Sequence, residues 1–406
     1  MSSLLQKIKS YIKGDLFIWS LVAVLALFSF MPVYSASTNL VYVAGNGTTV
    51  GFLIKHAVLL VLGFAIMLFV HRVPYRYFSG VSLVMIPLVI ILLIVTLAQG
   101  TTIGGANAAR WIRIPIIGVG FQTSTLAGLV LMVFTARYLA KRKEELIDLK
   151  ESLWRLWLPI ALVLMFILPA NFSTTAIVFT MIVFLCFVGG YPVKYLAGII
   201  GAGVLLLMLF GLTAKAFPGL MPNRVDTWVS RIESFSDQEA KEGYQVENAK
   251  IAIATGGLTG KGPGKSVQKN FLPQSSSDFI FAIIVEEYGL FGAGVVVLAY
   301  FLLMFRIYVV AKKAGTVFGK LLVVGVGMPV VFQAIINMMV ATNLGPVTGQ
   351  TLPLISSGGT SIWMTCLAIG MVLSVSASAN ITEEDLATQS EDPLEKLYGL
   401  KEVEES

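Results

Sequence analysis

Long apolar segments, each near twenty residues and almost free of charge, recur along this sequence. A helix of twenty residues is about 30 Å long, which matches the hydrocarbon core of a bilayer. A membrane β-barrel would show alternating segments of about ten residues, so continuous apolar runs predict helices. Only 13% of the residues are charged and 56% are hydrophobic, unlike a soluble domain. The sequence therefore predicts an all-α polytopic membrane protein.

Ten segments are expected to span the membrane. The least obvious pair lies within the 38 uncharged residues 156–193, which as one helix would measure about 57 Å, nearly twice the membrane core. Two spans separated at Pro169 fit better, because proline disrupts a helix interior. The predicted spans are Leu16–Ala36, Gly51–Val70, Gly80–Ala98, Ser124–Ala140, Leu156–Pro169, Asn171–Val188, Tyr195–Ala214, Tyr288–Val310, Leu321–Ala341 and Ser361–Ala379.

Positive charges orient these spans. With ten spans both termini share one side, and sixteen lysines and arginines fall in the N-terminal segment, the short loops and the adjoining span ends of that side. The short loops of the other side hold Arg110 and Arg113. Cytoplasmic loops are enriched in lysine and arginine, so both termini are predicted to be cytoplasmic. Nine spans would move the cluster from Arg306 to Lys320 outside, which argues for ten.

The chain then divides into a cytoplasmic N-terminus (1–15), a transmembrane domain (16–380) and an acidic cytoplasmic tail (381–406). The tail carries nine acids and two lysines, a composition typical of disorder. The net charge of +6 does not indicate nucleic-acid binding, because the cations are scattered between spans rather than grouped. One large extracytoplasmic loop (215–277) between spans seven and eight concentrates the polar residues, so function is expected there.

This large loop contains a glycine-rich stretch, 256–266, with Lys261 and Lys265 inside it. Such a stretch can bring backbone N–H groups and ammonium groups close to phosphates. It is not a P-loop, because Thr259 stands where that motif requires its first glycine. A phosphate-binding loop and a flexible surface turn are both compatible with the pattern.

Asp278 follows the three serines Ser275, Ser276 and Ser277 at the end of this loop. Serine is a preferred helix N-cap, so Asp278 is expected in the first turn of the eighth span, at the outer membrane surface. A carboxylate there can be catalytic. By composition alone, a simple helix-start carboxylate is the commoner reading.

Glu286 and Glu287 lie about two turns deeper in the same span. An unpaired acid at the centre of a span costs about 3 kcal/mol, so these residues require a partner or a polar cavity. Lys55 is the other charge well inside an apolar run and is the predicted counter-ion. Such a group can be a structural ion pair or a functional one.

The other polar residues restrict which kinds of site the chain can form. His56 and His71 are too few for a metal cluster, and no spacing resembles a zinc site. Between the last two spans, residues 342–361 interrupt an uncharged stretch with glycine, proline, serine and threonine. Irregular backbone at membrane depth is tolerated where it lines a cavity, so this segment is predicted to wall the same outer cavity as Asp278.

Several motifs, in order, resemble the SEDS family of cell-wall glycan polymerases, the FtsW and RodA group. The resemblance covers nearly all of residues 15–380, and the stretch from Tyr244 to Gly289 is more similar to the division subgroup, FtsW. The matching residues are Gly243, Tyr244, Gln245, Gly256, Gly257, Gly260, Lys261, Gly262, Leu272, Pro273, Asp278, Phe279, Ile280, Phe281, Ala282, Glu286, Glu287, Gly289, Pro346, Thr348, Gly349, Leu352, Pro353, Ser356, Gly358, Gly359 and Ser361.

The chain departs from that family at two places. The family's Gln-Pro-Ser-Glu-x-x-Lys pattern reads Gln122 to Gly128 here, with Thr125 and Gly128 in place of the acid and the base. Losing both leaves no unpaired charge, which suggests a replaced ion pair. The family's Pro-Asp-x-Gly pattern begins with Pro169, Ala170 and Asn171, so a role for that acid does not carry over.

The resemblance implies an enzyme that polymerises lipid II into glycan strands, with Asp278 as the general base. It also implies a class B penicillin-binding protein transpeptidase and other division proteins as partners, in the bacterial cytoplasmic membrane. Cationic side chains, or a divalent cation such as Mg²⁺ or Mn²⁺, would stabilise the leaving pyrophosphate. The candidate substrate-binding residues are Arg224, Arg231, Lys261, Lys265, Gly260, Gly262, Ser356, Gly358 and Gly359.

Two other functions remain compatible with the sequence. A lipid II flippase or transporter would use Glu286, Glu287 and Lys55 along a substrate path. A non-catalytic scaffold would only support a transpeptidase. The polar outer loop with a carboxylate at its membrane edge favours the enzyme.

Overall fold

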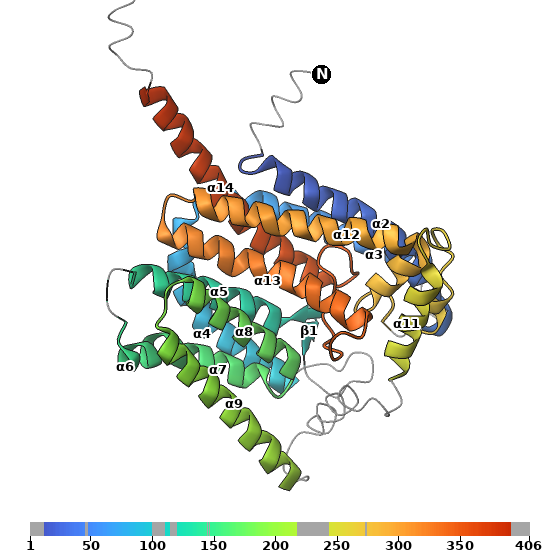
Figure 1. The fold of residues 1–406 in the computed structure, drawn as a ribbon, viewed down its shortest axis with the longest axis horizontal. Coiled ribbons are helices and arrows are strands. Elements are labelled where there is room, and N and C mark those ends of the chain that lie inside the picture. The colour runs from blue at the N-terminus through green and yellow to red at the C-terminus, as the bar shows by residue number, and fades with distance from the viewer. Residues whose placement is uncertain are drawn as a thin grey trace, which may run out of the picture.

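The computed structural model describes residues 12–44, 48–99, 110–113, 120–143, 145, 147–216, 243–272 and 274–390. Nearly all of the regular structure in these residues is helical (Figure 1). The helices are α2 (Leu16–Ala44), α3 (Thr49–Val70), α4 (Arg76–Gln99), α5 (Thr123–Lys141), α6 (Leu149–Ser152), a π-helical turn (Leu153–Trp157), α7 (Leu158–Ile167), α8 (Phe172–Val188), α9 (Val193–Ala216), α11 (Tyr244–Gly256), a 3₁₀ turn (Gln268–Asn270), α12 (Ile280–Lys313), α13 (Val317–Ala341) and α14 (Gly359–Ser390).

Each of the ten predicted spans falls on a helix. Within the described part of the chain, seven helices are long and apolar enough to cross a membrane, and Phe172–Val188 and Val193–Leu209 form two shorter apolar helices. Large apolar side chains such as Leu27 and Val84 are each 71% exposed, as expected for surfaces that face lipid. The chain is therefore a multi-pass helical membrane protein, and the exact count of ten spans stays a prediction.

The helix break predicted at Pro169 is present. Helix α7 ends at Ile167, and α8 begins at Phe172 after Asn171, whose side-chain oxygen accepts a hydrogen bond from the Thr174 backbone N–H. Asparagine is among the best N-cap residues, so Asn171 starts α8 shortly after α7 has ended.

The helices pack into two connected apolar cores. One core lies among α2, α3, α12, α13 and α14, and the other lies mainly among α4, α5, α7 and α8. The long helices α12 and α13 lie side by side, and α13 also packs on α5, so α13 joins the two cores (Figure 1). The start of α2 and the end of α14 lie at the end of the bundle opposite to α11 (Figure 1).

Two features differ from the predictions: a short hairpin in a chain expected to be all helical, and a helix at the start of the tail expected to be disordered. Residues Trp111–Arg113 (β1) and Gly120–Gln122 (β2) pair as an antiparallel hairpin. The hydroxyl of Thr360 donates to the Gly120 carbonyl and accepts from the Gln122 N–H, which fixes the hairpin to the start of α14. Helix α14 also continues to Ser390, so the first residues of the predicted acidic tail are helical, whereas 391–406 lie outside the described residues.

Candidate active site

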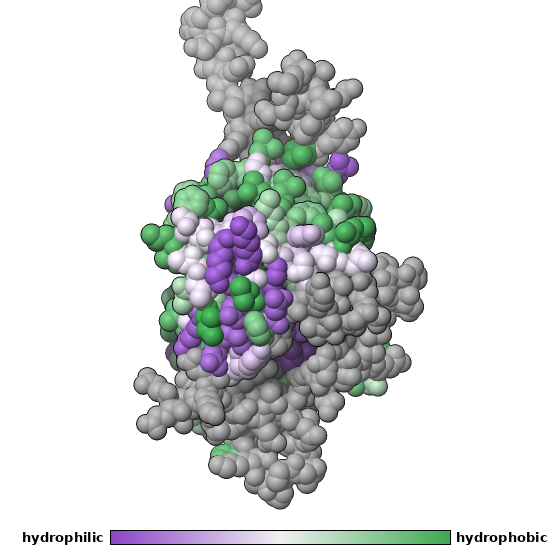
Figure 2. Space-filling model, turned by 90° about the vertical axis from the view of Figure 1, so that its right-hand side faces the viewer, coloured by the Kyte–Doolittle hydropathy of each residue, from purple (hydrophilic) through white to green (hydrophobic). Residues whose placement is uncertain are grey.

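Two segments meet at the α11 end of the bundle: the stretch from 257 to 279, which leads into α12, and the loop 342–358, which joins α13 to α14. Figure 2 views this end and shows hydrophilic residues gathered on it, with apolar residues around them. The predicted outer cavity wall and the predicted catalytic segment are therefore neighbours in space.

Asp278 lies in the turn that directly precedes α12. Helix α12 begins at Ile280 with Phe279 as its N-cap, so the expectation that Asp278 occupies the first helical turn is off by two residues. Asp278 is partly exposed as a residue, and its backbone carbonyl accepts a 2.7 Å hydrogen bond from Asn337 Nδ2. A Cβ atom added at Gly349 would lie 3.5 Å from Asp278 Oδ2, so the carboxylate faces the loop 342–358.

The serines before Asp278 bind this loop rather than cap α12. The Ser356 hydroxyl donates to the Ser277 carbonyl at 2.6 Å and accepts from the Leu352 N–H at 2.8 Å. The backbone N–H and the hydroxyl of Ser357 both donate to the Ser276 carbonyl at 3.0 Å. Ser356 is 1% exposed, so in this structure it holds the two segments together. Its predicted contact with substrate stays a prediction, as do those of the partly exposed Gly358 and Gly359.

The glycine-rich stretch supports a kink in α12. At Gly289 the backbone leaves the helical region (φ 66°, ψ −166°), which interrupts the hydrogen bonding of the helix. The Glu286 and Glu287 carbonyls instead accept from the N–H groups of Lys261 and Gly262 at 2.9 Å. On the far side of the kink, Leu290 N–H donates to the Gly257 carbonyl and Phe291 N–H to the Leu258 carbonyl.

These contacts correct one expectation for the glycine-rich stretch. The amides of Gly260, Lys261 and Gly262 all donate within the protein, so they do not form a phosphate cradle. A Cβ atom at Gly260 would lie 2.2 Å from the Glu287 carbonyl oxygen, and its φ is +77°. Glycine is therefore required at position 260 for two reasons. A side chain would clash with the Glu287 carbonyl, and other residues rarely adopt a positive φ.

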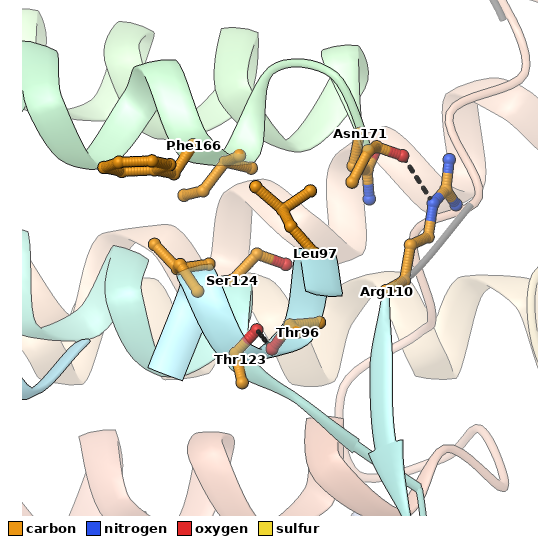
Figure 3. A pocket seen from close by; sticks show the side chains of 10 residues that line it. Thr96, Leu97, Arg110, Thr123, Ser124, Phe166 and Asn171 are labelled. Carbon is orange, nitrogen blue, oxygen red and sulfur yellow. Dashed lines mark hydrogen bonds between the residues drawn. The ribbon is translucent and has the colours of Figure 1, made fainter. Parts of the chain in front are cut away.

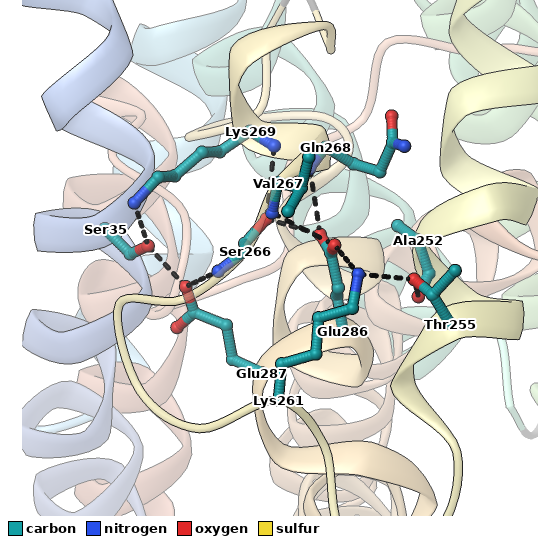
Figure 4. Close-up of polar contacts among 10 residues, drawn as sticks. All are labelled: Ser35, Ala252, Thr255, Lys261, Ser266, Val267, Gln268, Lys269, Glu286 and Glu287. Carbon is teal, nitrogen blue, oxygen red and sulfur yellow. Dashed lines mark hydrogen bonds and ion pairs between the residues drawn. The ribbon is translucent and has the colours of Figure 1, made fainter.

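Glu286 is fully buried and surrounded by donors (Figure 4). Lys261 Nζ lies 2.6 Å from Glu286 Oε1, which also accepts from the Val267 N–H at 3.0 Å. The other oxygen accepts from the Ser266 hydroxyl and from the Gln268 N–H. An ionised buried carboxylate is stable only when it is paired and hydrogen-bonded, and this arrangement meets that condition.

Glu287 lies beside it and turns toward α2 (Figure 4). Its Oε1 accepts from the Ser35 hydroxyl and from the Ser266 N–H, and Lys269 Nζ lies 3.3 Å from the Ser35 hydroxyl oxygen. Its Oε2 is buried and has no hydrogen-bond partner among the described residues. The two glutamates thus tie α12 to both α2 and the large loop.

The predicted counter-ion was wrong. Lys55 is exposed on α3, and the lysine that pairs with Glu286 is Lys261. The loop folds back over the eighth span, so its lysine reaches an acid that the sequence places inside the membrane. Lys261 Nζ also donates to the Thr255 hydroxyl at 2.9 Å and is therefore engaged, whereas the side chain of Lys265 is exposed.

Residues from the two segments that depart from the family, Thr123 and Ser124 from one and Ala170 and Asn171 from the other, line one small pocket (Figure 3). Arg110 Nε donates to the Ala170 carbonyl at 2.8 Å, and the hydroxyls of Thr96 and Thr123 lie 3.0 Å apart. These polar contacts of the pocket are therefore made by the two threonine hydroxyls and by the Ala170 carbonyl that accepts from Arg110. The pocket lining is Leu93, Thr96, Leu97, Arg110, Thr123, Ser124, Phe166, Ile167, Ala170 and Asn171.

Some candidate residues are not placed, and others were missed. Arg224 and Arg231 lie outside the described residues. The sequence reasoning overlooked Asn337 and Ser266, which contact Asp278 and the two glutamates respectively. An amide inside an apolar helix was the available signal for Asn337, because a buried polar group requires partners.

The side chains of the described residues do not provide the set of ligands that a metal site needs. Among the described residues no three His, Cys, Asp or Glu side chains gather in one place. Divalent cations such as Mg²⁺ prefer several oxygen ligands, which Asp278 does not supply by itself. We therefore assign no step of the chemistry to a metal ion.

These observations define a class: a multi-pass helical membrane protein with a polar end, where the partly exposed residue Asp278 lies between two loops. The cell cycle protein family of FtsW, RodA and SpoVE matches residues 15–381. The chain belongs to this family.

Individual relatives agree with this assignment. The probable peptidoglycan glycosyltransferase FtsW of Nitrosomonas europaea is 31% identical over 371 residues, covering 89% of this chain and 92% of that protein. The protein of the same name from Hahella chejuensis is 30% identical over 385 residues, covering 92% of each.

Solved structures show the same fold. A chain from a peptidoglycan synthase complex that coordinates polymerization and crosslinking superposes with a TM-score of 0.68 at 24% identity, covering 90% of this chain and 98% of that chain. The rod shape determining protein RodA of Thermus thermophilus gives a TM-score of 0.65 at 24% identity, covering 91% and 99%.

Proposed function

We propose that this chain is a peptidoglycan glycosyltransferase that polymerises lipid II, with Asp278 as the general base. Family membership and relatives named as peptidoglycan glycosyltransferases support the activity. The observation that carries the assignment of the base is the partly exposed residue Asp278, held at the junction of two loops with its carboxylate facing Gly349.

The chemistry requires one base. A sugar hydroxyl of one substrate attacks the anomeric carbon of the other, the new glycosidic C–O bond forms, and the hydroxyl proton passes to Asp278. The bond between that carbon and the polyprenyl pyrophosphate breaks, and its electron pair leaves with the pyrophosphate. A positioned general base contributes about 10²- to 10⁴-fold in rate. Because pyrophosphate leaves as an anion, the acid that glycoside hydrolysis uses is not needed.

The pyrophosphate requires cations nearby. Lys265 is exposed in the loop and is the candidate that the described residues support best. Arg224 and Arg231 stay candidates by charge and by position in the large loop. Lys261 is a weaker candidate for phosphate binding, because its ammonium group is paired with Glu286. Cationic groups preorganised around a developing anion stabilise the transition state.

The reaction is proposed to take place at the outer face of the bacterial cytoplasmic membrane, with both termini in the cytoplasm. The asymmetry of the short-loop lysines and arginines supports this orientation. A class B penicillin-binding protein transpeptidase is the proposed partner, together with other division proteins. The similarity to a chain of a peptidoglycan synthase complex supports the first, and relatives named FtsW support a role in division.

Polymerisation of lipid II in vesicles tests this proposal. The purified chain, with its transpeptidase partner, should extend glycan strands, and Asp278→Asn should abolish extension while the complex still forms. Lipid II that crosses the bilayer without polymer would support a transporter. Polymer that depends on the partner and is unaffected by Asp278→Asn would support a scaffold, and either result contradicts the proposal.

The transporter hypothesis is also weakened by the structure. It relied on Glu286, Glu287 and Lys55 lining one substrate path. Lys55 is exposed on α3, and Glu286 is buried among donors from the large loop. These contacts support a structural role for the two glutamates.

A further inference from the structure

Asn337 lies on α13 and is completely buried, at 0% exposure. Its Nδ2 group donates two hydrogen bonds, one to the Asp278 carbonyl at 2.7 Å and one to the Gln350 carbonyl at 2.8 Å. Both partners are backbone carbonyls, which can only accept, so the NH₂ end of the amide must point toward them. One side chain therefore joins the segment of the proposed base to the loop opposite it.

The loop residue on the other side of this bridge also borders the carboxylate. Gly349 precedes Gln350 and has a φ of +69°, and a Cβ atom there would lie 3.5 Å from Asp278 Oδ2. Asn337 thus fixes the main chain of Asp278 at the point where Gly349 leaves room for its carboxylate. Because Asn337 contacts the backbone of Asp278, it can set the position of the base without contacting a substrate.

A second amide on the same helix provides a comparison. Gln333 lies one turn before Asn337, so the two side chains share a face of α13. Gln333 Nε2 donates to the Thr351 carbonyl at 2.9 Å, to the Thr351 hydroxyl at 3.0 Å and to the Ser361 hydroxyl at 3.2 Å. It binds the loop residue next to Gln350 and the first turn of α14, and the hydrogen bonds found for it do not include the segment of Asp278.

We propose that Asn337 is a positioning residue for the glycosyl-transfer reaction, which holds the backbone of Asp278 and loop 342–358 in register so that the base reaches the attacking hydroxyl. This inference rests on the proposed function of Asp278. Effective general-base catalysis requires the base within hydrogen-bond reach of the proton it removes. A displacement of about 1 Å at a reacting group can lower the rate about 100-fold.

The test compares Asn337→Ala with Gln333→Ala in the lipid II polymerisation assay. Asn337→Ala should lower kcat about 10- to 100-fold and change KM for lipid II less than about 3-fold. Gln333→Ala should leave kcat within about 3-fold of the wild type. Unfolding temperatures in detergent are measured for both variants, and activity is assayed well below the lower of the two.

Three results would overturn the proposal. An unchanged kcat for Asn337→Ala would exclude a positioning role. Equal losses of kcat in the two variants would show that each substitution acts only by making loop 342–358 less ordered, and not by moving Asp278. A loss confined to KM would place Asn337 in substrate binding instead.

The pH dependence supplies a second readout, and Asp278→Asn separates this inference from the proposed function. If Asn337 acts through the base, the rate of Asn337→Ala should fall across the whole pH range where the wild type is active, with the profile keeping its shape. A profile of altered shape would contradict positioning. If Asp278→Asn polymerises normally, the proposed base itself is wrong, whatever Asn337→Ala does.

Discussion

At the scale of single residues, the sequence predicted correctly that Glu286 needs a partner and wrongly that this partner is Lys55. An acid in an apolar run implies compensation, because burying an unpaired charge is costly. The choice between Lys55 and Lys261 depends on how the large loop folds back on α12, which periodicity and charge do not reveal. Asp278 was singled out by resemblance, whereas the amide that holds its backbone, Asn337, gave a weaker signal.

The stability of substituted proteins shows whether Lys261 or Lys55 is the partner of Glu286. Glu286→Gln removes the charge that pairs with Lys261 and should lower the free energy of unfolding by about 2 kcal/mol, since part of its hydrogen bonding survives. Lys55→Gln should leave the unfolding temperature unchanged, because the side chain is exposed. Thermal unfolding in detergent measures both. A larger loss for Lys55→Gln would restore the pairing predicted from the sequence.

At the scale of elements, the helices were predictable and their interruptions only partly so. Proline marked the break between α7 and α8, since it disrupts a helix interior. Glycine marks a kink far less clearly, because many glycines occur in membrane helices. The kink at Gly289 depends on the stretch 257–262, which supplies partners for the freed backbone groups. The short hairpin β1–β2 had no clear signal in the sequence.

The kink predicts unequal effects of two glycine substitutions in α12. Gly289→Ala should destabilise the protein by about 3 kcal/mol, because its φ of 66° suits glycine and the new Cβ would lie 2.3 Å from the Leu258 carbonyl oxygen. Gly294→Ala on the same helix meets nothing within 4 Å and should be neutral or slightly stabilising. Thermal unfolding checks the pair. Equal stability would mean that the kink is not required.

At the scale of the whole molecule, charge asymmetry predicts which end faces outward. The structure places the start of α2 and the end of α14 at one end and α11 at the other (Figure 1), an arrangement that fits ten spans. Apolar runs specify a helical membrane protein because each must match the bilayer. They do not specify which helices pack together, since lipid-facing and buried surfaces of such helices are both apolar.

Cysteine labelling tests this orientation. A cysteine replacing the exposed Glu247 of α11 should react with a membrane-impermeant maleimide on the outer side of the membrane. A cysteine replacing Gly315, between α12 and α13, should react only after the membrane is permeabilised. The native Cys186 and Cys366 are buried, so their background reaction should be low. The reverse pattern would place Asp278 in the cytoplasm and contradict the proposed reaction.

The central claim is that one carboxylate at the outer end of the bundle removes the proton of the attacking sugar hydroxyl. The rate of lipid II polymerisation by Asp278→Asn, relative to Glu247→Gln, tests it most directly, since both changes neutralise one acid at the same end of the chain's fold. We expect Asp278→Asn to lose at least about 100-fold in rate and Glu247→Gln to keep the wild-type rate. Equal rates for the two variants would contradict the account.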